Sequence, residues 1–347
     1  MKALIGMSGG VDSSVAAYLM KESGYECIGA TMKLYTCEDA GSSCADARSV
    51  AVRMGIPFYV FDFSRDFSEL VMDDFVRCYR SGLTPNPCIQ CNRHLKFHRF
   101  LQKARELGCD CIVTGHYARI RQLESGRLCL QKAVDESKDQ TYFLYTLTQE
   151  QLQHTRFPLG SLSKAQARQL ALEQGFVTAG KRDSQDICFV PDGDYMAFLE
   201  RYTGQAAVAG NFLDEAGNVV GRHRGAAGYT LGQRKGLGLA MGEPVYVCGK
   251  DMAANTVTVG PNESLYRKSL IAENWNFMTI DRLDAPIRVK AKARSRMTEQ
   301  PATVYPMDHG AARVEFDEPQ RAITPGQAVV LYDGDLVVGG GTITQVL

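Results

Sequence analysis

The sequence lacks long apolar runs, an excess of either charge, internal repeats and low-complexity segments. No apolar stretch approaches the ~18 residues that a membrane-spanning helix needs. Residues 1–10, with one lysine and a short apolar run broken by glycine, do not resemble a signal peptide, so we expect a cytoplasmic protein. Because 39 Lys and Arg balance 39 Asp and Glu, any affinity for nucleic acid must come from a local patch.

The composition is that of an ordinary globular protein, with 45% hydrophobic and 22% charged residues. These values exclude a disordered chain, a collagen-like repeat and a small disulfide scaffold. The 11 cysteines are an odd number spread over 347 residues, which favours a reducing compartment over a disulfide framework. The length predicts about two or three domains.

Up to about residue 197, short apolar runs alternate with amphipathic helical stretches. The expected strands are residues 2–7, 27–33, 58–63 and 109–114, and the expected helices are residues 11–23, 44–54 and 93–107. This alternation predicts the α/β class, with a doubly wound parallel sheet whose ligands bind beyond the carboxyl ends of the strands.

The pattern changes after about residue 198, where the glycine-rich residues 204–242 predict a small mixed domain. From about Ser269, alternating segments between Pro and Gly turns predict a compact β-barrel or sandwich. These segments are residues 287–296, 302–305, 311–316, 328–332 and 336–338. The expected domains are therefore residues 1–197, 198–268 and 269–347.

Residues 8–14, SGGVDSS, join the first expected strand to the first expected helix. Adjacent glycines let the backbone approach a pyrophosphate, while the helix N-terminus offers free N–H groups and a positive dipole end. Ser8, Ser13 and Ser14 add hydroxyl donors. The loop lacks the Gly-Lys-Ser/Thr ending of a Walker A motif, which serves γ-phosphate transfer. A Gly-rich turn with a serine cap is the alternative without a ligand.

Three cysteines are candidates for chemistry. Cys88 and Cys91 form a CxxC at the start of an expected helix, where the positive dipole end lowers a thiol pKa. With the distant Cys188 they supply three thiolates, which leaves a fourth coordination position open for chemistry. A structural zinc would need a fourth ligand, for which His94 and His98 are available.

The other cysteines have simpler explanations. Cys37 and Cys44 flank an acidic loop, where they could pair or bind a metal. The remaining cysteines in apolar segments are expected to be small buried hydrophobes, namely Cys27, Cys109, Cys111, Cys129 and Cys248.

SGGVDSS is the signature of the PP-loop ATP pyrophosphatases, which the N-terminal domain therefore resembles. Further motifs follow in order along nearly the whole chain: residues 84–93 with Lys96-Phe97, then 114–118, 138–144, 184–189, 231–238 and 324–327. Together they resemble the bacterial tRNA-specific 2-thiouridylase family. That family implies a catalytic PP-loop domain, a small central domain and a C-terminal β-barrel.

The resemblance implies that ATP is cleaved to AMP and pyrophosphate and that Mg²⁺ is held with the help of Asp12. It assigns ATP binding to Gly6, Met7, Ser8, Gly9, Gly10, Val11, Asp12, Ser13, Met32 and Gly115. It assigns tRNA contacts to Asn86, Pro87, Cys88, His116, Lys138, Asp139, Gln140, Arg294, Ser295 and Gln327.

The implied reaction is 2-thiolation of uridine 34 in the tRNAs for Lys, Glu and Gln. Attack of the uracil C2 oxygen on the α-phosphate of ATP makes AMP the leaving group, and sulfur then attacks C2 of a base turned out of its stack. The sulfur is expected to come from a cysteine desulfurase or another sulfur-relay protein.

The sequence departs from the commoner family pattern at Cys88, where that pattern has Asp. In that pattern Cys91 matches the nucleophile and Cys188 the cysteine that carries a persulfide. The three cysteines resemble those of sulfur-transferring PP-loop enzymes that hold a [4Fe–4S] cluster. We hypothesise that Cys88, Cys91 and Cys188 ligate such a cluster; a cluster-free cycle, with persulfide on Cys188 and resolution by Cys91, is the alternative.

Residues 288–296 alternate cations with small or apolar residues, the cations being Arg288, Lys290, Lys292, Arg294 and Arg296. On one strand such residues share a face at spacings of ~6.6 Å. This row would match a phosphate track and predicts contact with RNA. A solvated strand face opposite a core is the alternative.

Other functions fit parts of the sequence. A PP-loop enzyme could thiolate another tRNA position, or amidate or ligate a substrate, although no glutaminase-like second domain is visible. An RNA-binding protein with a structural zinc would release no pyrophosphate when given ATP and tRNA.

Overall fold

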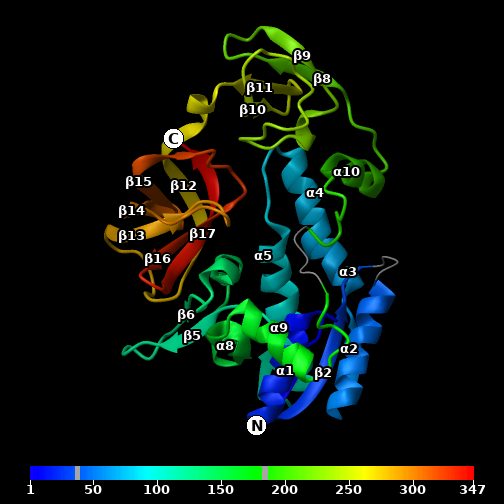
Figure 1. Ribbon diagram of the computed structural model, residues 1–347. Coiled ribbons are helices and arrows are strands. Elements are labelled where there is room, and N and C mark those ends of the chain that lie inside the picture. The colour runs from blue at the N-terminus through cyan, green and yellow to red at the C-terminus, as the bar shows by residue number, and fades with distance from the viewer. Residues whose placement is uncertain (36–39, 182–186) are drawn as a thin grey trace.

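The computed structural model describes residues 1–35, 40–181 and 187–347. Three parts can be followed in Figure 1: a sheet covered by helices near the N-terminus, a small sheet at the opposite end, and a C-terminal barrel beside them. Cys37 and residues 184–186 of the predicted Ser184–Phe189 motif lie outside the described residues. Within the described residues, no helix is both long and apolar enough to cross a membrane.

The N-terminal sheet has the strand order β3-β2-β1-β4-β7, and every pairing in it is parallel. The strands are β1 (Lys2–Gly6), β2 (Glu26–Lys33), β3 (Phe58–Asp62), β4 (Cys111–Val113) and β7 (Thr155–Arg156). On β1, Ala3 and Ile5 join one buried cluster while Leu4 joins another, as alternation along a strand requires. The sheet is therefore covered on both faces, which confirms the predicted α/β architecture.

The helices divide between the two faces of this sheet. One cluster contains residues of α1 (Val11–Glu22), α2 (Ala40–Met54) and α9 (Lys164–Glu173). The other contains residues of α3 (Ser64–Phe67), α4 (Asp73–Arg80), α5 (Pro87–Cys91) and α6 (Phe100–Glu106). The π-helical residues 92–99 join α5 to α6, so the predicted helix 93–107 begins earlier, at Pro87. Proline suits this first position because it needs no N–H partner there.

The remaining helices are short. They are α7 (Thr141–Leu144), α8 (Gln149–Gln153) and α10 (Tyr195–Thr203). The helix α10 leads into the small sheet, whose order is β10-β11-β8-β9. Its strands are β8 (Gly210–Leu213), β9 (Val219–His223), β10 (Tyr246–Asp251) and β11 (Thr256–Gly260).

The C-terminal sheet closes on itself because β12 pairs with both β15 and β17. Its six barrel strands are β12 (Tyr266–Phe277), β13 (Ile287–Lys292), β14 (Gln300–Pro306), β15 (Ala312–Arg321), β16 (Ala328–Asp333) and β17 (Leu336–Val346). All their pairings are antiparallel. Closure leaves no open sheet edge within the barrel, so the barrel, rather than the sandwich, is the correct alternative.

Two features of this sheet differ from expectation. The strand predicted over residues 287–296 ends at Lys292, and the chain then turns. A hairpin of β5 (Arg119–Gln122) and β6 (Leu128–Gln131) extends the sheet, because Gln131 pairs with Leu336 of β17. The N-terminal part of the chain therefore contributes strands to the C-terminal sheet.

We retain the three-domain division as a proposal, with boundaries shifted slightly toward the N-terminus. The helix α10 spans the predicted boundary at residue 197, and β12 spans the one at residue 268. Because a boundary falls in a linker rather than within an element, we place the two boundaries before Tyr195 and Tyr266.

Candidate active site

A cavity of about 720 Å³ lies at the carboxyl ends of β1, β2 and β4. This is the edge where ligands of open parallel sheets bind. Of the residues predicted to bind ATP, it is lined by Gly6, Met7, Ser8, Asp12, Ser13, Met32 and Gly115. Gly9, Gly10 and Val11 belong to the same loop and helix start without lining the cavity.

The loop between β1 and α1 is held by hydrogen bonds within itself. The Ser8 N–H donates to Ser13 Oγ at 3.1 Å, and Ser13 Oγ donates to the Gly10 carbonyl at 3.2 Å. Gly9 has φ +73°, and a Cβ there would lie 2.1 Å from the Ser43 carbonyl oxygen, so only glycine fits. The sequence predicts that the Ser14 hydroxyl is a donor for the ligand. In the structure Ser14 is fully buried and its hydroxyl donates to the Gly10 carbonyl, so it supports the loop and does not face the cavity.

Gly115 brings the end of β4 against the start of α1. A Cβ at Gly115 would lie 2.8 Å from the Asp12 carbonyl carbon and from the Ser13 nitrogen. Because Gly115 has no side chain, the end of β4 can lie close against the start of α1, and both border the cavity.

Two lysines supply positive charge around the loop. Lys164 Nζ lies 2.8 Å from both carboxylate oxygens of Asp12, which also accepts a 2.9 Å hydrogen bond from the Tyr117 hydroxyl. Lys181 Nζ donates to the Gly9 carbonyl at 3.1 Å and pairs with Asp46. The loop has no Walker-type lysine, so these two side chains bring positive charge to it from other segments.

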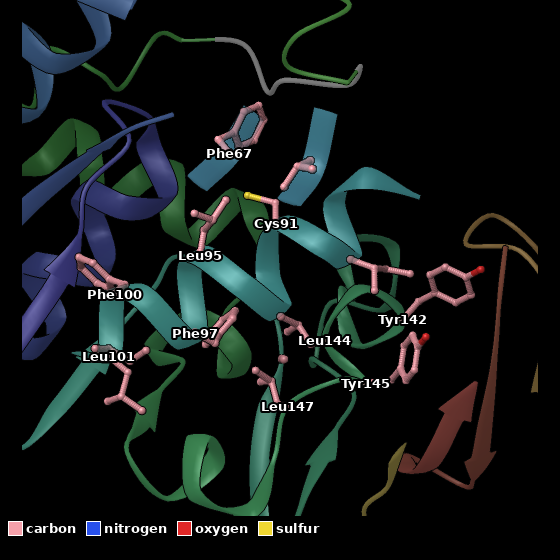
Figure 2. Packing of buried hydrophobic residues seen from close by; sticks show 14 of the residues in the cluster. Phe67, Cys91, Leu95, Phe97, Phe100, Leu101, Tyr142, Leu144, Tyr145 and Leu147 are labelled. Carbon is pink, nitrogen blue, oxygen red and sulfur yellow. The ribbon is translucent and has the colours of Figure 1, made fainter. Parts of the chain in front are cut away.

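Cys188 lines the cavity, and Cys91 lies behind it in the core. Figure 2 shows Cys91 among buried hydrophobic side chains, with Phe67 on one side and Leu95 on the other. Cys88, three residues earlier and on the same helix, is exposed. The Tyr35 hydroxyl donates to the Cys188 carbonyl, which fixes the backbone there.

The three thiols influence one another's ionisation. Cys188 is accessible to solvent, but desolvation by the surrounding protein and the charges of Cys91 and Cys88 together raise its pKa to about 12, against an opposing effect of Lys96. Burial raises the pKa of Cys91, and desolvation by nearby protein raises that of Cys88 although solvent reaches this residue; Lys96 opposes both effects. The expectation that the helix N-terminus would lower the pKa of this CxxC is therefore wrong, because desolvation outweighs it.

No three His, Cys, Asp or Glu side chains among the described residues are arranged to hold a metal ion. His94 or His98 therefore does not complete a zinc site with Cys88, Cys91 and Cys188. The hypothesis that these three cysteines ligate an iron–sulfur cluster stays a prediction. The cysteines present in this region are all free thiols.

His116 and Gln140 border the same cavity. His116 Nδ1 is 2.8 Å from the Thr114 hydroxyl, and burial, aided by the charge of Lys96, lowers the pKa of His116 well below its usual value. The side-chain oxygen of Gln140, Oε1, accepts a 2.9 Å hydrogen bond from the Tyr117 N–H. A neutral imidazole and a fixed amide thus border the space between the phosphate loop and Cys188.

Family models match the chain in succession. They are described as the tRNA methyl transferase HUP domain over residues 1–192, the tRNA methyl transferase PRC-barrel domain over residues 196–261 and the aminomethyltransferase beta-barrel domain over residues 267–343. The tRNA-specific 2-thiouridylase MnmA of Clostridioides difficile is 50% identical to the chain, covering 100% of this chain and 99% of that protein. The MnmA of Symbiobacterium thermophilum is 51% identical, covering 100% and 93%. This chain belongs to the tRNA-specific 2-thiouridylase family.

Solved structures resemble the chain more distantly. The U34-tRNA thiolase NcsA from Methanococcus maripaludis with its [4Fe-4S] cluster matches with a TM-score of 0.38 and 18% identity, covering 58% of this chain and 67% of that one. At this distance the match carries no argument about the cysteines of the 2-thiouridylase.

Two short stretches of the residues that the family resemblance links to tRNA each lead into a helix. Asn86 and Pro87 start α5 beside Cys88, while Lys138, Asp139 and Gln140 precede α7. Within this second stretch, the Asp139 carboxylate accepts from Ala133 N at 3.0 Å and from the Thr141 hydroxyl at 2.5 Å. Burial raises the pKa of Asp139, and its two hydrogen bonds link the chain on either side of this stretch.

The predicted row of five cations is broken. Arg288, Lys290 and Lys292 follow one another on β13, but Arg294, Ser295 and Arg296 lie in the turn after it. Arg294 is half-buried and donates to the Leu231 carbonyl at 2.9 Å and to the Thr324 hydroxyl. The predicted strand fails because these distant partners hold the guanidinium inside the protein.

Sequence reasoning missed Lys164 and Lys181, and it named Tyr117 and Lys96 only as parts of motifs. Lys164 lies at the start of α9 and more than 150 positions from Asp12, with nothing local to link them. Tyr117 and Lys96 lie within quoted motifs, and their place in those motifs is the signal that could have identified them as site residues.

Proposed function

We propose that this chain catalyses the ATP-dependent 2-thiolation of the uridine at position 34 of tRNA. The observation that carries the proposal is the single cavity lined both by the phosphate loop and by Cys188. An enzyme that activates an oxygen with ATP and replaces it with sulfur needs both at one place. The full-length identity to 2-thiouridylases supports this reaction over amidation or ligation.

The first step activates the uracil carbonyl. The C2 oxygen attacks the α-phosphorus of ATP, an O–P bond forms, and the bond to the β-phosphate bridging oxygen breaks to release pyrophosphate. Backbone N–H groups at the start of α1 face the phosphates. We expect Lys164, which is paired with Asp12, and Lys181, which is bound to the Gly9 carbonyl, to offset part of the negative charge of the phosphates.

The donors present fit a magnesium ion bound together with ATP. Mg²⁺ is usually held by one or two carboxylates plus substrate phosphates, and Asp12 supplies such a carboxylate at the cavity wall. When bound, the ion would neutralise phosphate charge. Asp12 would then exchange its contact with Lys164 for the ion, leaving the ammonium to the phosphates.

The second step replaces the activated oxygen. We propose that a persulfide on Cys188 attacks C2 through its terminal sulfur, so that a C–S bond forms and the C–O bond to AMP breaks. The Cys91 thiolate then attacks Cys188 Sγ, the sulfur–sulfur bond breaks, and the 2-thiouridine leaves. The resulting Cys91–Cys188 disulfide needs a dithiol reductant before a sulfur-relay protein or cysteine desulfurase reloads Cys188.

The persulfide route needs no iron–sulfur cluster, so we derive no step through one. The cluster hypothesis has its own test, which is iron and acid-labile sulfide in anaerobically purified protein beside a Cys88→Ala variant. The persulfide route predicts little of either in both proteins. About four of each per chain, lost in the variant, would replace the persulfide route by a cluster.

The decisive experiment measures pyrophosphate release and 2-thiouridine in digested tRNA, with ATP, a sulfur source and unmodified tRNA. Cys188→Ser and Cys91→Ser should abolish 2-thiouridine, while Cys248→Ser, a half-buried cysteine of β10, should behave as wild type. ATP binding should survive in all three variants. Turnover of ATP without thiouridine in the wild type would contradict the proposed function.

A further inference from the structure

The turn between β15 and β16, residues 324–327, is packed on the loop that precedes α5. The Thr84 N–H donates to the Pro325 carbonyl at 2.9 Å. The Gln327 side-chain amide donates to the carbonyls of Thr84 at 2.9 Å and Pro85 at 3.3 Å. The barrel therefore supplies these hydrogen bonds to the backbone of Thr84 and Pro85, just before the CxxC.

The turn is shaped for this contact. Gly326 has φ +91°, and a Cβ there would lie 2.9 Å from the Thr84 nitrogen and 3.0 Å from Leu83 Cβ. The turn is also fixed from behind, because Gly326 N donates to the Ile343 carbonyl and Ile343 N donates to the Gln327 carbonyl, both at 2.8 Å. The turn is therefore rigid, and it presents the side-chain amide of Gln327 to the loop before α5.

The same turn is tied to the small central part of the molecule. Thr324 accepts a hydrogen bond from Arg294, which also donates to the Leu231 carbonyl. The three parts of the chain therefore meet at this turn. Only two residues separate Pro85 from Cys88, and prolines at positions 85 and 87 leave little backbone freedom between them.

We propose that Gln327 is a positioning residue that sets the location of Cys88 and Cys91 through the Thr84–Pro85 backbone. Both N–H groups of its side chain are engaged by that backbone in the free protein, so Gln327 holds this loop whether or not it also contacts RNA. The expected effect of Gln327 on thiolation rests on the proposed function. The expected effect of Gln327 on the loop and cysteines of the free protein does not depend on that function.

The test compares Gln327→Met with Gln345→Met in free protein. Methionine has a similar size and no charge but lacks the two donors, and Gln345 is an exposed glutamine on β17. In Gln327→Met, hydrogen exchange at the Thr84 amide and alkylation of buried Cys91 should each accelerate about tenfold, because two carbonyls lose their partners. Gln345→Met should match the wild type at both positions.

Kinetics then separate positioning from RNA contact. Single-turnover thiolation by Gln327→Met should fall about tenfold, while the Kd for tRNA stays within about twofold of wild type. Unchanged exchange at Thr84 and unchanged Cys91 alkylation, with a weakened Kd, would overturn the proposal and make Gln327 an RNA contact. Faster alkylation in a protein whose wild type makes no thiouridine would support the positioning role and contradict the proposed function.

A second variant covers the case in which Gln327→Met loosens the whole protein. Gly326→Ala keeps the glutamine but places a methyl group against Thr84. We expect the same local acceleration at Thr84 and Cys91. Wild-type exchange at Thr84 in this variant would overturn the proposal.

Discussion

The phosphate loop and the cysteine centre border one cavity, but they are built in different ways. The loop is stabilised by contacts between neighbours in the chain, such as Ser8 with Ser13 and Ser13 with Gly10. The cysteine centre is assembled from distant segments, because Cys188 is held by Tyr35 and the loop before Cys88 is held by the barrel. The further contacts of the first region, such as those from Lys164 and Lys181, also come from the N-terminal domain, whereas the second region depends on the position of the barrel.

This difference has a functional consequence. ATP must be bound in every turnover, so a phosphate site that does not depend on domain position is ready at all times. Sulfur transfer must wait for the correct base, so a cysteine centre that depends on the barrel can be coupled to RNA binding. The predictions below test where each description fails.

The largest expected effect is at Gly115, where the phosphate loop depends on one distant residue. Gly115→Ala places a Cβ 2.8 Å from the backbone of Asp12 and Ser13 and should weaken ATP binding about 100-fold by displacing that backbone. Calorimetric titration with ATP measures the change. Gly180→Ala, where a Cβ meets nothing within 4 Å, is the control. A wild-type Kd in Gly115→Ala would show that the loop tolerates displacement.

The next effect is at Lys164, the cation held by Asp12. Lys164→Met removes a charge-assisted interaction near the phosphates and should weaken ATP binding about 30-fold. Lys103→Met, on the exposed face of α6 beside Glu106, should leave the Kd unchanged. If both variants bind ATP equally well, Lys164 serves only to hold Asp12.

The same difference explains what could be predicted from the sequence. The strands, the first helix and the phosphate loop follow from local rules: Gly10 precedes α1, and Gly24 with φ +80° follows its end. The pairing of Lys164 with Asp12 spans 152 positions, so no local pattern contains it.

The pKa of the cysteines was likewise beyond a local rule. A CxxC at a helix start favours thiolates, but the packing around Cys91 decides the outcome, and that packing includes Phe67 and Leu95 (Figure 2). The prediction of one strand over residues 288–296 is wrong for a similar reason, because the distant residues Leu231 and Thr324 hold Arg294.

The ionisation of Cys188 is the third test, in the free protein without tRNA. With its pKa raised to about 12, Cys188 is protonated at neutral pH and its thiolate fraction grows as pH rises. Its alkylation by iodoacetamide should therefore increase about tenfold per pH unit between about pH 7 and pH 9, without a plateau. Mass spectrometry of the Cys188 peptide follows the rate.

Lys96→Met sharpens this test, because Lys96 lowers the pKa of Cys188, Cys91 and Cys88. Its loss should raise these pKa values and slow alkylation of Cys188 about threefold at fixed pH. A plateau near pH 8 in the wild type would mean that the free protein holds an activated thiolate at Cys188, and the burial argument would be wrong.

The smallest expected effect concerns the cations that remain on β13. Lys290 is exposed, whereas Arg288 is paired with Asp317 through both carboxylate oxygens. A phosphate contact contributes about 0.7–0.9 to the slope of log K against log salt. Lys290→Ala should therefore reduce that slope by about this amount and weaken tRNA binding about twofold, while Arg288→Ala should change less because Asp317 competes for the guanidinium. An equal loss of slope and affinity in both variants would support the continuous cationic face predicted from the sequence, although the turn at Arg294 interrupts it.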